Sequence, residues 1–234
     1  MEEVYNAIDV YKDKSYTEYK NYERFKFMLT HMEDSLNEAS SLLDIGCAKG
    51  EYISALQEIY PKIEYTGIEY STELVEIANK HSFLKEVTIT QGDVTSLNLD
   101  KEFDITVLAG VLSIFDDFET PLLNMIKHTK KNGQGFIFGG FNSDDIDVRI
   151  KYKNNYLGST EWESGWNILS LSTISKFLED HVSKFEINKF QIDQDLSKQD
   201  NPVTSYTKRL NNGENIILTG GNIVRDFYLI SFTK

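Results

Sequence analysis

Two glycines and an acidic residue make up the pattern with the clearest chemical content. The segment LLDIGCAKGEY, residues 42–52, is an apolar run that ends at Gly46 and continues into helix-forming residues after Gly50. Glycines at such a turn let a ligand approach backbone N–H groups closely. Glu69, which ends the next apolar run, is placed to accept hydrogen bonds from ribose hydroxyls. The pattern predicts a site for a nucleoside-containing ligand.

The spacing of the glycines separates two kinds of ligand. Nicotinamide-binding proteins show G-x-G-x-x-G, whereas here Glu51 stands where the last glycine should fall. Asp44, two residues before Gly46, suits a cationic ligand, because a carboxylate attracts a sulfonium and an α-amino group. The pattern therefore favours a sulfonium-bearing ligand. A nucleotide- or NAD-binding enzyme on a related sheet is the alternative.

Four pieces of the chain, in order, resemble the motifs of the class I S-adenosylmethionine-dependent methyltransferases. They are residues 42–52, Glu69 within YTGIEYS, the triplet Gly92-Asp93-Val94, and DITVLAGV at residues 104–111. The resemblance implies S-adenosylmethionine as cofactor, S-adenosylhomocysteine as product and methyl transfer as activity. The cofactor-binding residues that it implies are Asp44, Gly46, Cys47, Ala48, Gly50, Glu69, Tyr70, Asp93, Val94, Ala109 and Gly110.

The resemblance also divides the cofactor among these residues. It implies that Asp44, Gly46 and Gly50 hold the methionine part of the cofactor. Ala109 and Gly110, which follow the fourth apolar run, are implied to lie under the same part. The methionine end of the cofactor is therefore expected between the first and the fourth strands.

The other pieces of the resemblance are implied to bind the ribose and the adenine ring. The resemblance implies that Glu69 binds the ribose hydroxyls, that Asp93 faces the adenine amino group and that Val94 lies beside the ring. Ala48 departs from the family pattern, because many members have glycine at this position. Alanine is suited to the position if its φ is negative.

Alternating strands and helices must position these residues. Apolar runs predict strands at 41–46, 63–69, 85–90, 103–109 and 135–141, and 3.6-residue periodicity predicts helices at 16–38, 50–59, 71–80 and 121–131. Ser71 is the expected N-cap of its helix, and Gly133 is expected just past the end of the 121–131 helix. This alternation predicts an α/β fold with a doubly wound parallel sheet.

The second half of the chain predicts additions to that sheet. A helix at 172–181, a strand at 184–192 and a last strand at 225–233 complete a Rossmann-like sheet of seven strands, the last one antiparallel. Residues 142–166 and 193–222 are expected to be small cap insertions on the substrate side, the latter with a β-hairpin around Asn211-Asn212-Gly213. The predicted organisation is a single methyltransferase domain, 1–234, with a helical lid at 1–39 and a cofactor-binding half at 40–141.

The acceptor side rests on a looser resemblance. Past residue 141 the chain is similar to bacterial methyltransferases of capsule and surface-polysaccharide synthesis, including O-methyl phosphoramidate decoration. That similarity implies a small, polar, sugar-linked acceptor and O-methylation, with Asn142, Arg149, Trp166 and Asn167 on the acceptor side. Arg149, Lys151 and Lys153 could hold an anionic acceptor or could be a solvated strand face. A non-catalytic protein that binds S-adenosylmethionine or S-adenosylhomocysteine is the alternative function.

The composition of the chain limits the kinds of binding partner that are expected. A net charge of −13 argues against nucleic acid and against anionic membrane surfaces, and the most apolar stretch is too short and too polar to insert into a bilayer. With one cysteine and no secretory signal pattern, the expected location is cytoplasmic, and no metal site is predicted. Cys47 is expected to be a packed turn residue and Lys49 a solvated charge. No catalytic base or oligomeric state can be assigned, since structural roles are favoured for His31, His81, His128 and His181.

Overall fold

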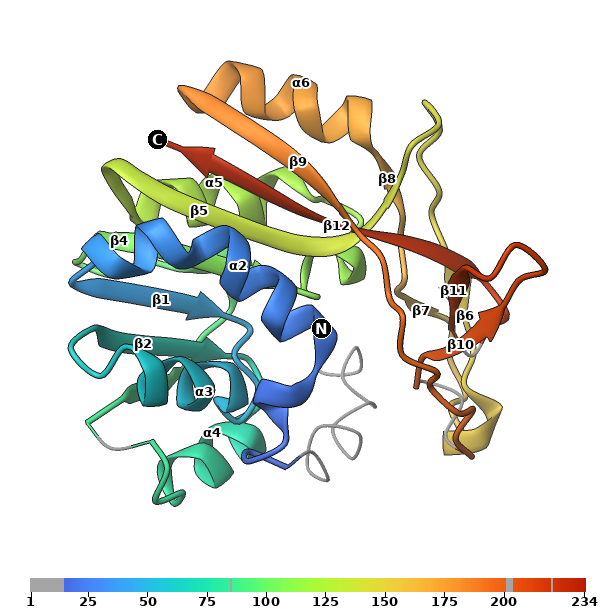
Figure 1. Ribbon diagram of the computed structural model, residues 1–234, viewed down its shortest axis with the longest axis horizontal. Coiled ribbons are helices and arrows are strands. Elements are labelled where there is room, and N and C mark those ends of the chain that lie inside the picture. The colour runs from blue at the N-terminus through green and yellow to red at the C-terminus, as the bar shows by residue number, and fades with distance from the viewer. Residues whose placement is uncertain (1–14, 85, 201–203, 220) are drawn as a thin grey trace.

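One β-sheet runs through the centre of the protein. The computed structural model describes residues 15–84, 86–200, 204–219 and 221–234, and ten strands of this part of the chain form the sheet (Figure 1). Seven of them make its main body, in the order β3–β2–β1–β4–β5–β12–β9. Their bounds are Ser41–Ile45 (β1), Glu64–Glu69 (β2), Thr88–Gln91 (β3), Phe103–Ala109 (β4), Thr129–Asn142 (β5), Lys184–Phe190 (β9) and Val224–Thr233 (β12).

The strand directions confirm the predicted sheet. The pairs β1–β2, β1–β4, β2–β3 and β4–β5 are parallel. The last strand, β12, lies between β5 and β9 and runs antiparallel to both. The sheet extends beyond the predicted seven strands through β8 (Leu169–Ser170) beside β5 and through the hairpin of β10 (Tyr206–Arg209) and β11 (Asn215–Leu218) beside β12.

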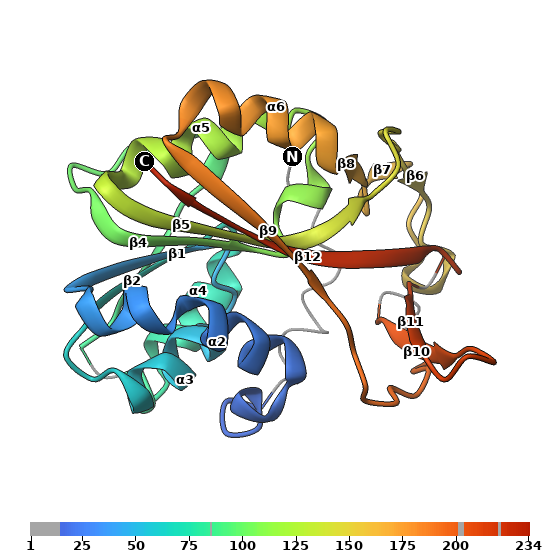
Figure 2. The ribbon, with the colours of Figure 1, turned by 45° about the horizontal axis from the view of Figure 1, so that its top comes forward.

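Helices cover both faces of the sheet, as a doubly wound fold requires. Figure 2 shows α2 (Glu23–Glu38), α3 (Glu51–Ile59) and α4 (Thr72–Asn79) on one face and α5 (Glu119–His128) and α6 (Leu171–His181) on the other. Each face buries its own apolar cluster. None of the helices in the described residues is long and apolar enough to cross a membrane.

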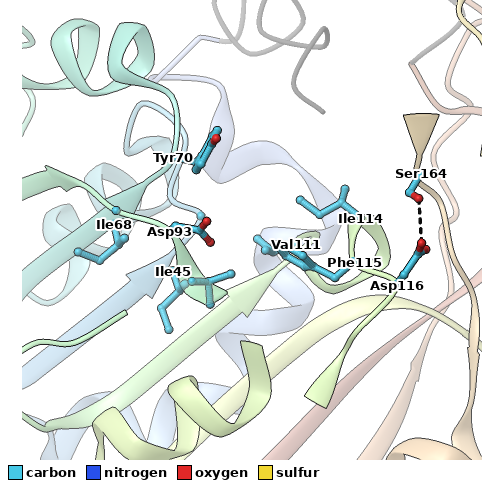
Figure 3. Close-up of a pocket in the computed structure, with 12 residues that line it drawn as sticks. Ile45, Ile68, Tyr70, Asp93, Val111, Ile114, Phe115, Asp116 and Ser164 are labelled. Atoms are coloured by element: carbon cyan, nitrogen blue, oxygen red, sulfur yellow. Dashed lines mark hydrogen bonds between the residues drawn. The ribbon is translucent and has the colours of Figure 1, made fainter. Parts of the chain in front are cut away.

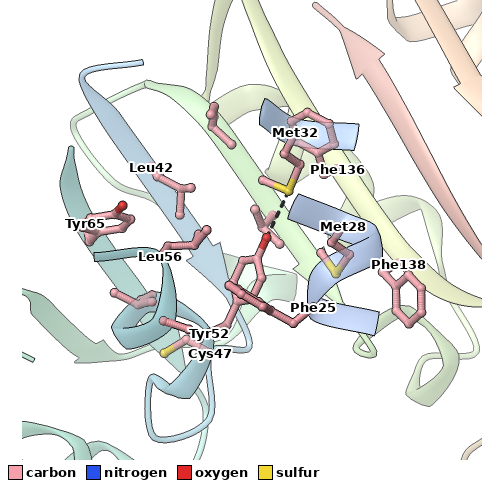
Figure 4. Packing of buried hydrophobic residues seen from close by; sticks show 14 of the residues in the cluster. Phe25, Met28, Met32, Leu42, Cys47, Tyr52, Leu56, Tyr65, Phe136 and Phe138 are labelled. Atoms are coloured by element: carbon pink, nitrogen blue, oxygen red, sulfur yellow. Dashed lines mark hydrogen bonds between the residues drawn. The ribbon is translucent and has the colours of Figure 1, made fainter. Parts of the chain in front are cut away.

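Aromatic side chains pack α2 and α3 against each other. Tyr52 of α3 donates a hydrogen bond to the sulfur of Met32 in α2, at 3.0 Å, and Phe25 meets the Tyr52 ring edge-on with ring centroids 5.6 Å apart (Figure 4). Such edge-to-face pairs stabilise a fold by about 0.5–1.5 kcal/mol beyond the free energy gained by burying their area. Helix α3 starts directly after the glycine-containing loop, so this packing also fixes the position of that loop.

The predicted helix at 121–131 was wrong at its end. Helix α5 stops at His128, where the ring Nδ1 lies 2.7 Å from the carbonyl oxygen of Asn124, and β5 begins at the next residue. Gly133 is therefore no helix cap. It lies in an irregular part of β5, where a Cβ would come 2.9 Å from the carbonyl oxygens of Asp104 and Lys130. A bulge, and not a helix end, uses this glycine.

Two other element bounds also differ from the prediction. The helix expected over 16–38 is interrupted at Tyr22, which has extended backbone between a 3₁₀ turn at Tyr19–Asn21 and α2. The strand expected at 85–90 begins only at Thr88. Ser71 caps α4 as predicted, because its hydroxyl accepts a hydrogen bond from the N–H of Leu74.

The two cap segments lie beyond the carboxyl ends of the parallel strands (Figures 1 and 2). Residues 142–166 carry a short two-stranded sheet of β6 (Lys151–Tyr152) and β7 (Glu163–Ser164) and a 3₁₀ turn at Asn155–Leu157. Residues 193–222 carry the predicted hairpin, in which Arg209 pairs with Asn215 across the turn. A Cβ on Gly221 would lie 4.0 Å from the ring of Trp166, so the two segments approach each other.

Candidate functional site

Three cavities lie in a row along the carboxyl ends of the strands. We call them the Asp93 cavity, the Asp44 cavity and the Arg225 cavity, and their volumes are about 220, 120 and 50 Å³. Gly46 lines both the Asp93 and the Asp44 cavities. Gly110 and Phe227 line both the Asp44 and the Arg225 cavities. The row therefore passes from the end of β3, over β1 and β4, to β5 and β12, as ligand sites in open α/β sheets do.

The loop after β1 separates the first two cavities. Gly46 has φ +77° and Gly50 has φ +82°, in the left-handed region that favours glycine. A Cβ on Gly46 would collide with a methyl group of Val111. The N–H groups of Gly46 and Cys47 both donate to the carbonyl oxygen of Ile68, at 2.7 and 3.0 Å, so the loop is held against β2.

Ala48 does not meet the condition under which alanine suits the loop. Its φ is +50°, not negative, because the backbone must turn to bring the Ala48 N–H within 2.9 Å of the Glu69 carboxylate. The other carboxylate oxygen of Glu69 accepts from the Ser71 N–H at 2.8 Å. Glu69 thus ties the loop after β1 to the start of α4.

Buried negative charge dominates the Asp44 cavity. Asp44 is 3% exposed, and burial together with the charges of Glu51 and Glu69 raises its pKa to about 7. Burial also raises the pKa of Glu69, against the lowering effect of the N–H groups that bind it. A cationic ligand would relieve this repulsion, so the electrostatics of the cavity suit the sulfonium and ammonium groups expected from the sequence.

Two further residues of the loop are packed. Burial is the main cause that raises the pKa of the Cys47 thiol, and its sulfur lies where a Cβ on Gly67 would come within 2.7 Å. This arrangement agrees with a packed turn residue. The expectation of a solvated Lys49 was wrong: Lys49 is 3% exposed, and its Nζ lies 5.1 Å from the centre of the Tyr16 ring. The stem of the lysine is covered because Tyr16 folds over it.

The Asp93 cavity has mostly apolar walls (Figure 3). Asp93 and Val94, both expected near the adenine, line it, as does Tyr70, which was expected to bind the cofactor. One Asp93 oxygen accepts from the Thr95 N–H at 2.8 Å, which fixes the carboxylate at the end of β3. The loop after β4 supplies a wall that the sequence did not predict, including Phe115.

Most of the predicted cofactor residues therefore come together. Gly50 and Glu69 lie directly behind the loop after β1, Gly50 as the N-terminal cap position of α3. The other nine line one or more of the three cavities: Asp44, Gly46, Cys47, Ala48, Tyr70, Asp93, Val94, Ala109 and Gly110.

The predicted acceptor-side residues are more scattered. Asn167 lines the Arg225 cavity, but its amide is committed: it donates to the Phe115 carbonyl at 3.0 Å and accepts from the Ile150 N–H at 2.8 Å. Asn142, Arg149 and Trp166 are not among the lining residues of the three cavities. Asn142 and Trp166 have partners within the cap, Ile146 and Tyr152, whereas Arg149 donates to the Phe115 carbonyl in the loop after β4.

The basic cluster of the cap is also bonded internally. Lys151 forms an ion pair with Asp116 at 2.9 Å and a hydrogen bond with Ser164. Asp116 accepts from the Ser164 hydroxyl as well, at 3.2 Å (Figure 3). The lysine therefore holds the cap against the loop after β4, which favours the solvated structural face over an anion site at this cluster.

Residues from the two ends of the described chain also line the Asp44 and Arg225 cavities without belonging to the predicted motifs. They include Tyr19, Arg24, Arg225 and Phe227. The Arg24 guanidinium donates to the Tyr19 hydroxyl at 3.2 Å and faces the same cavity as Asp44. Tyr19 and Arg24 fall within the predicted lid, residues 1–39, whereas no local pattern marks Arg225 and Phe227, which reach the site through the pairing of β12 with β5.

Comparison with known proteins identifies the family. A family model described as a methyltransferase domain matches residues 36–194. A malonyl-[acyl-carrier protein] O-methyltransferase of Priestia megaterium is 22% identical over 159 residues, which cover 67% of this chain and 58% of that protein. A dTDP-4-amino-2,3,4,6-tetradeoxy-D-glucose N,N-dimethyltransferase of Saccharopolyspora spinosa is 34% identical over 106 residues, 44% of this chain and 41% of that protein. The chain spans about half the length of the curated relatives it matches.

Solved structures agree on the fold. The N-methyltransferase NodS from Bradyrhizobium japonicum WM9, in complex with S-adenosyl-L-homocysteine, has a TM-score of 0.54 and 14% sequence identity, and the match covers 99% of this chain and 98% of that one. The family model itself covers well over half of the residues. The chain therefore belongs to the methyltransferase domain family, and the prediction of a class I S-adenosylmethionine-dependent methyltransferase is confirmed at the level of the family.

Proposed function

We propose that the chain binds S-adenosylmethionine along the Asp93 and Asp44 cavities and methylates a small polar acceptor that enters through the Arg225 cavity. The observation that carries the proposal is the buried carboxylate of Asp44 beside a loop with two left-handed glycines. A protein core accepts such a charge at a cost of several kcal/mol unless a partner compensates it. A ligand with a sulfonium and an ammonium group is such a partner.

The cavities support the division of the cofactor that the motifs imply. Asp44 and the N–H groups of the loop after β1 would hold the methionine part, and Arg24 in the same cavity suits its carboxylate. Glu69 would accept hydrogen bonds from the ribose hydroxyls. The apolar walls of the Asp93 cavity would cover the adenine ring, with the Asp93 carboxylate near its amino group.

S-adenosylmethionine supplies a methyl group on a sulfonium, which leaves as a neutral thioether. Transfer then depends mainly on alignment and on exclusion of water. Gly110 and Phe227 stand where the Asp44 and Arg225 cavities meet, so they would flank the path between sulfonium and acceptor. The polar groups at the acceptor end, such as the Ser113 hydroxyl, can hydrogen-bond a small acceptor, and an anionic acceptor oxygen would need no base.

The relatives and the charge of the protein support the proposed class of acceptor. Relatives named for methylation of malonyl-[acyl-carrier protein] and of a dTDP-sugar support a small or carrier-linked acceptor. We retain O-methylation in surface-polysaccharide or phosphoramidate synthesis as the specific prediction, with nucleic acid disfavoured by the charge of −13. Of the predicted lid, residues 1–39, the first fourteen lie outside the described residues. Residues 15–39 would act as part of that lid, since Tyr19 and Arg24 line the Asp44 cavity. Residues 142–166 and 193–222 would shape the acceptor entrance.

Calorimetric titration with S-adenosylhomocysteine, beside NAD, tests the cofactor assignment. We expect micromolar binding of the former alone. Glu69→Ala should weaken it by more than about tenfold, or about 1.4 kcal/mol, because the ribose hydroxyls lose their acceptor. Glu64→Ala is the matched control, since Glu64 is an exposed carboxylate on the same strand and pairs with Lys101. Equal affinities for both variants, or binding of NAD instead, would contradict the assignment.

A further inference from the structure

Arg225 is a buried cation, and no anionic side chain in the described part of the chain pairs with it. It is the second residue of β12 and is 7% exposed. Within the described part of the chain its Nε is buried without a hydrogen-bond partner, and no ion pair reaches its guanidinium. The other three arginines all contact an acceptor: Arg24 the Tyr19 hydroxyl, Arg149 the Phe115 carbonyl and Arg209 the Asp195 carboxylate.

The backbone around Arg225 is shaped to admit the guanidinium. A Cβ on Gly140 would come 2.6 Å from both Nε and Nη2, so only glycine allows this close approach to β5. The guanidinium carbon also lies over the Phe227 ring, 5.3 Å from its centre. Both neighbours position the planar group, and neither neutralises its charge.

The free-energy cost of burying this charge points to a ligand that compensates it. Burial lowers the pKa of Arg225 to about 10, which still leaves the side chain charged at neutral pH. A buried charge without a partner is strongly destabilising and is rarely kept without a function. Among the described residues, the walls of the Arg225 cavity include Ser113 and three glycines but no aspartate or glutamate. An anion that enters this cavity would meet the guanidinium before any repelling carboxylate.

We propose that Arg225 binds an oxyanion, a carboxylate or a phosphate, on the methyl acceptor. The guanidinium fork donates two parallel hydrogen bonds to such groups. The proposal rests on the proposed function, because the Arg225 cavity shares Gly110 and Phe227 with the cavity assigned to the methionine end of the cofactor. An acceptor anchored by its anionic group at Arg225 would present a neighbouring nucleophile toward the methyl group. Arg225 is then a specificity-determining residue.

Anion binding to the protein saturated with S-adenosylhomocysteine provides the test. Malonate and inorganic phosphate are titrated separately at constant ionic strength, with and without S-adenosylhomocysteine, and the two probes distinguish a carboxylate site from a phosphate site. We expect at least one probe to bind, and Arg225→Gln to weaken its binding by about tenfold or more. Arg209→Gln is the control, since Arg209 is an exposed arginine outside the three cavities. The affinity for S-adenosylhomocysteine should change less than about twofold in both variants.

A second variant and an unfolding measurement distinguish loss of the anion site from misfolding. Gly140→Ala keeps the charge but displaces the guanidinium, so it should also weaken anion binding. Arg225→Gln should unfold at the same or a higher temperature than the wild type, because it removes a buried charge that has no partner.

Three results would overturn the proposal: neither probe binds, Arg225→Gln binds the probe as well as the wild type does, or Arg225→Gln weakens S-adenosylhomocysteine as strongly as the anion. The last result would mean that the guanidinium holds the carboxylate of the cofactor. Failure of S-adenosylhomocysteine to bind the wild type would instead refute the proposed function, and the titrations without it would still report on Arg225.

Discussion

Ionised Asp44 lowers the stability of the folded protein, and the same ionised form is the one that binds a cation. Its pKa is about 7 in the folded protein, against ~3.9 for an unfolded aspartate. The folded protein therefore holds a proton that the unfolded chain releases between about pH 4 and pH 7, so this group lowers the free energy of unfolding as the pH rises through that window. Asp44→Asn should remove this slope and raise stability at pH 8, measured by urea unfolding. Asp34→Asn, at an exposed position of α2, should change neither.

The same titration predicts the pH dependence of binding. A cationic ligand favours ionised Asp44, so binding of S-adenosylhomocysteine through its ammonium group should release protons below pH 7 and weaken as the pH falls. Asp44→Asn should bind more than about tenfold more weakly at pH 8 and lose this pH dependence. Calorimetry in buffers of different ionisation enthalpy measures the protons released. Unchanged affinity in the variant would contradict the role of Asp44.

Ala48 shows strain at the same loop. An alanine with φ +50° costs about 1–2 kcal/mol relative to ordinary backbone, whereas glycine adopts this conformation freely. Ala48→Gly should therefore raise the free energy of unfolding by about 0.5–1 kcal/mol after the greater entropy of the unfolded glycine is subtracted. Ala55→Gly, in the buried face of α3, should lower it by about 1 kcal/mol. A loss of stability in both variants would mean that the loop does not store strain.

At the scale of elements, Asn167 connects the loop after β4 to the cap. Its side-chain amide donates to the Phe115 carbonyl and the Asp116 carboxylate and accepts from the Ile150 N–H. Its backbone N–H donates to the Ser113 carbonyl at 2.8 Å. Asn167→Ala leaves buried backbone groups without partners and should cost about 2–3 kcal/mol of stability.

Because Phe115 lines the Asp93 cavity, Asn167→Ala should also weaken S-adenosylhomocysteine severalfold. Thermal unfolding with and without S-adenosylhomocysteine measures both effects. The control is Asn98→Ala, an exposed asparagine that accepts from Lys127, and it should change stability by no more than about 0.5 kcal/mol. Asn167 behaving like Asn98 would show that the loop and the cap are held by other contacts.

The elements also show which parts of the site the sequence could predict. The loop after β1 was predictable because its glycines, Asp44 and the adjoining strand are neighbours in the chain. Arg225 and Phe227 were not, because they reach the site only through the antiparallel pairing of β12 with β5. The end of α5 was misjudged because a glycine near a run of lysines resembles a helix cap, whereas Gly133 serves a bulge against β4.

At the scale of the whole molecule, the acidic balance should favour the charged form of the cofactor. The protein carries a net charge of −13, and S-adenosylmethionine has one more positive charge than S-adenosylhomocysteine but otherwise the same binding groups. Long-range attraction acts on the sulfonium and is screened by salt, with a Debye length of about 10 Å at 0.1 M and about 3 Å at 1 M. The affinity for S-adenosylmethionine should therefore depend on salt more strongly than the affinity for the thioether product.

Parallel titrations at low and at high salt measure this difference. Between about 0.02 and 0.5 M NaCl, we expect S-adenosylmethionine to weaken severalfold and S-adenosylhomocysteine by less than about twofold. In Asp44→Asn both ligands bind more weakly, but the difference in salt dependence should persist, because the field comes from acidic residues over the whole surface. Loss of the difference in this variant would place the attraction in Asp44 alone. Equal salt dependence in the wild type would mean that the acidic balance does not act on the site, and product release would then gain nothing from the loss of the sulfonium charge.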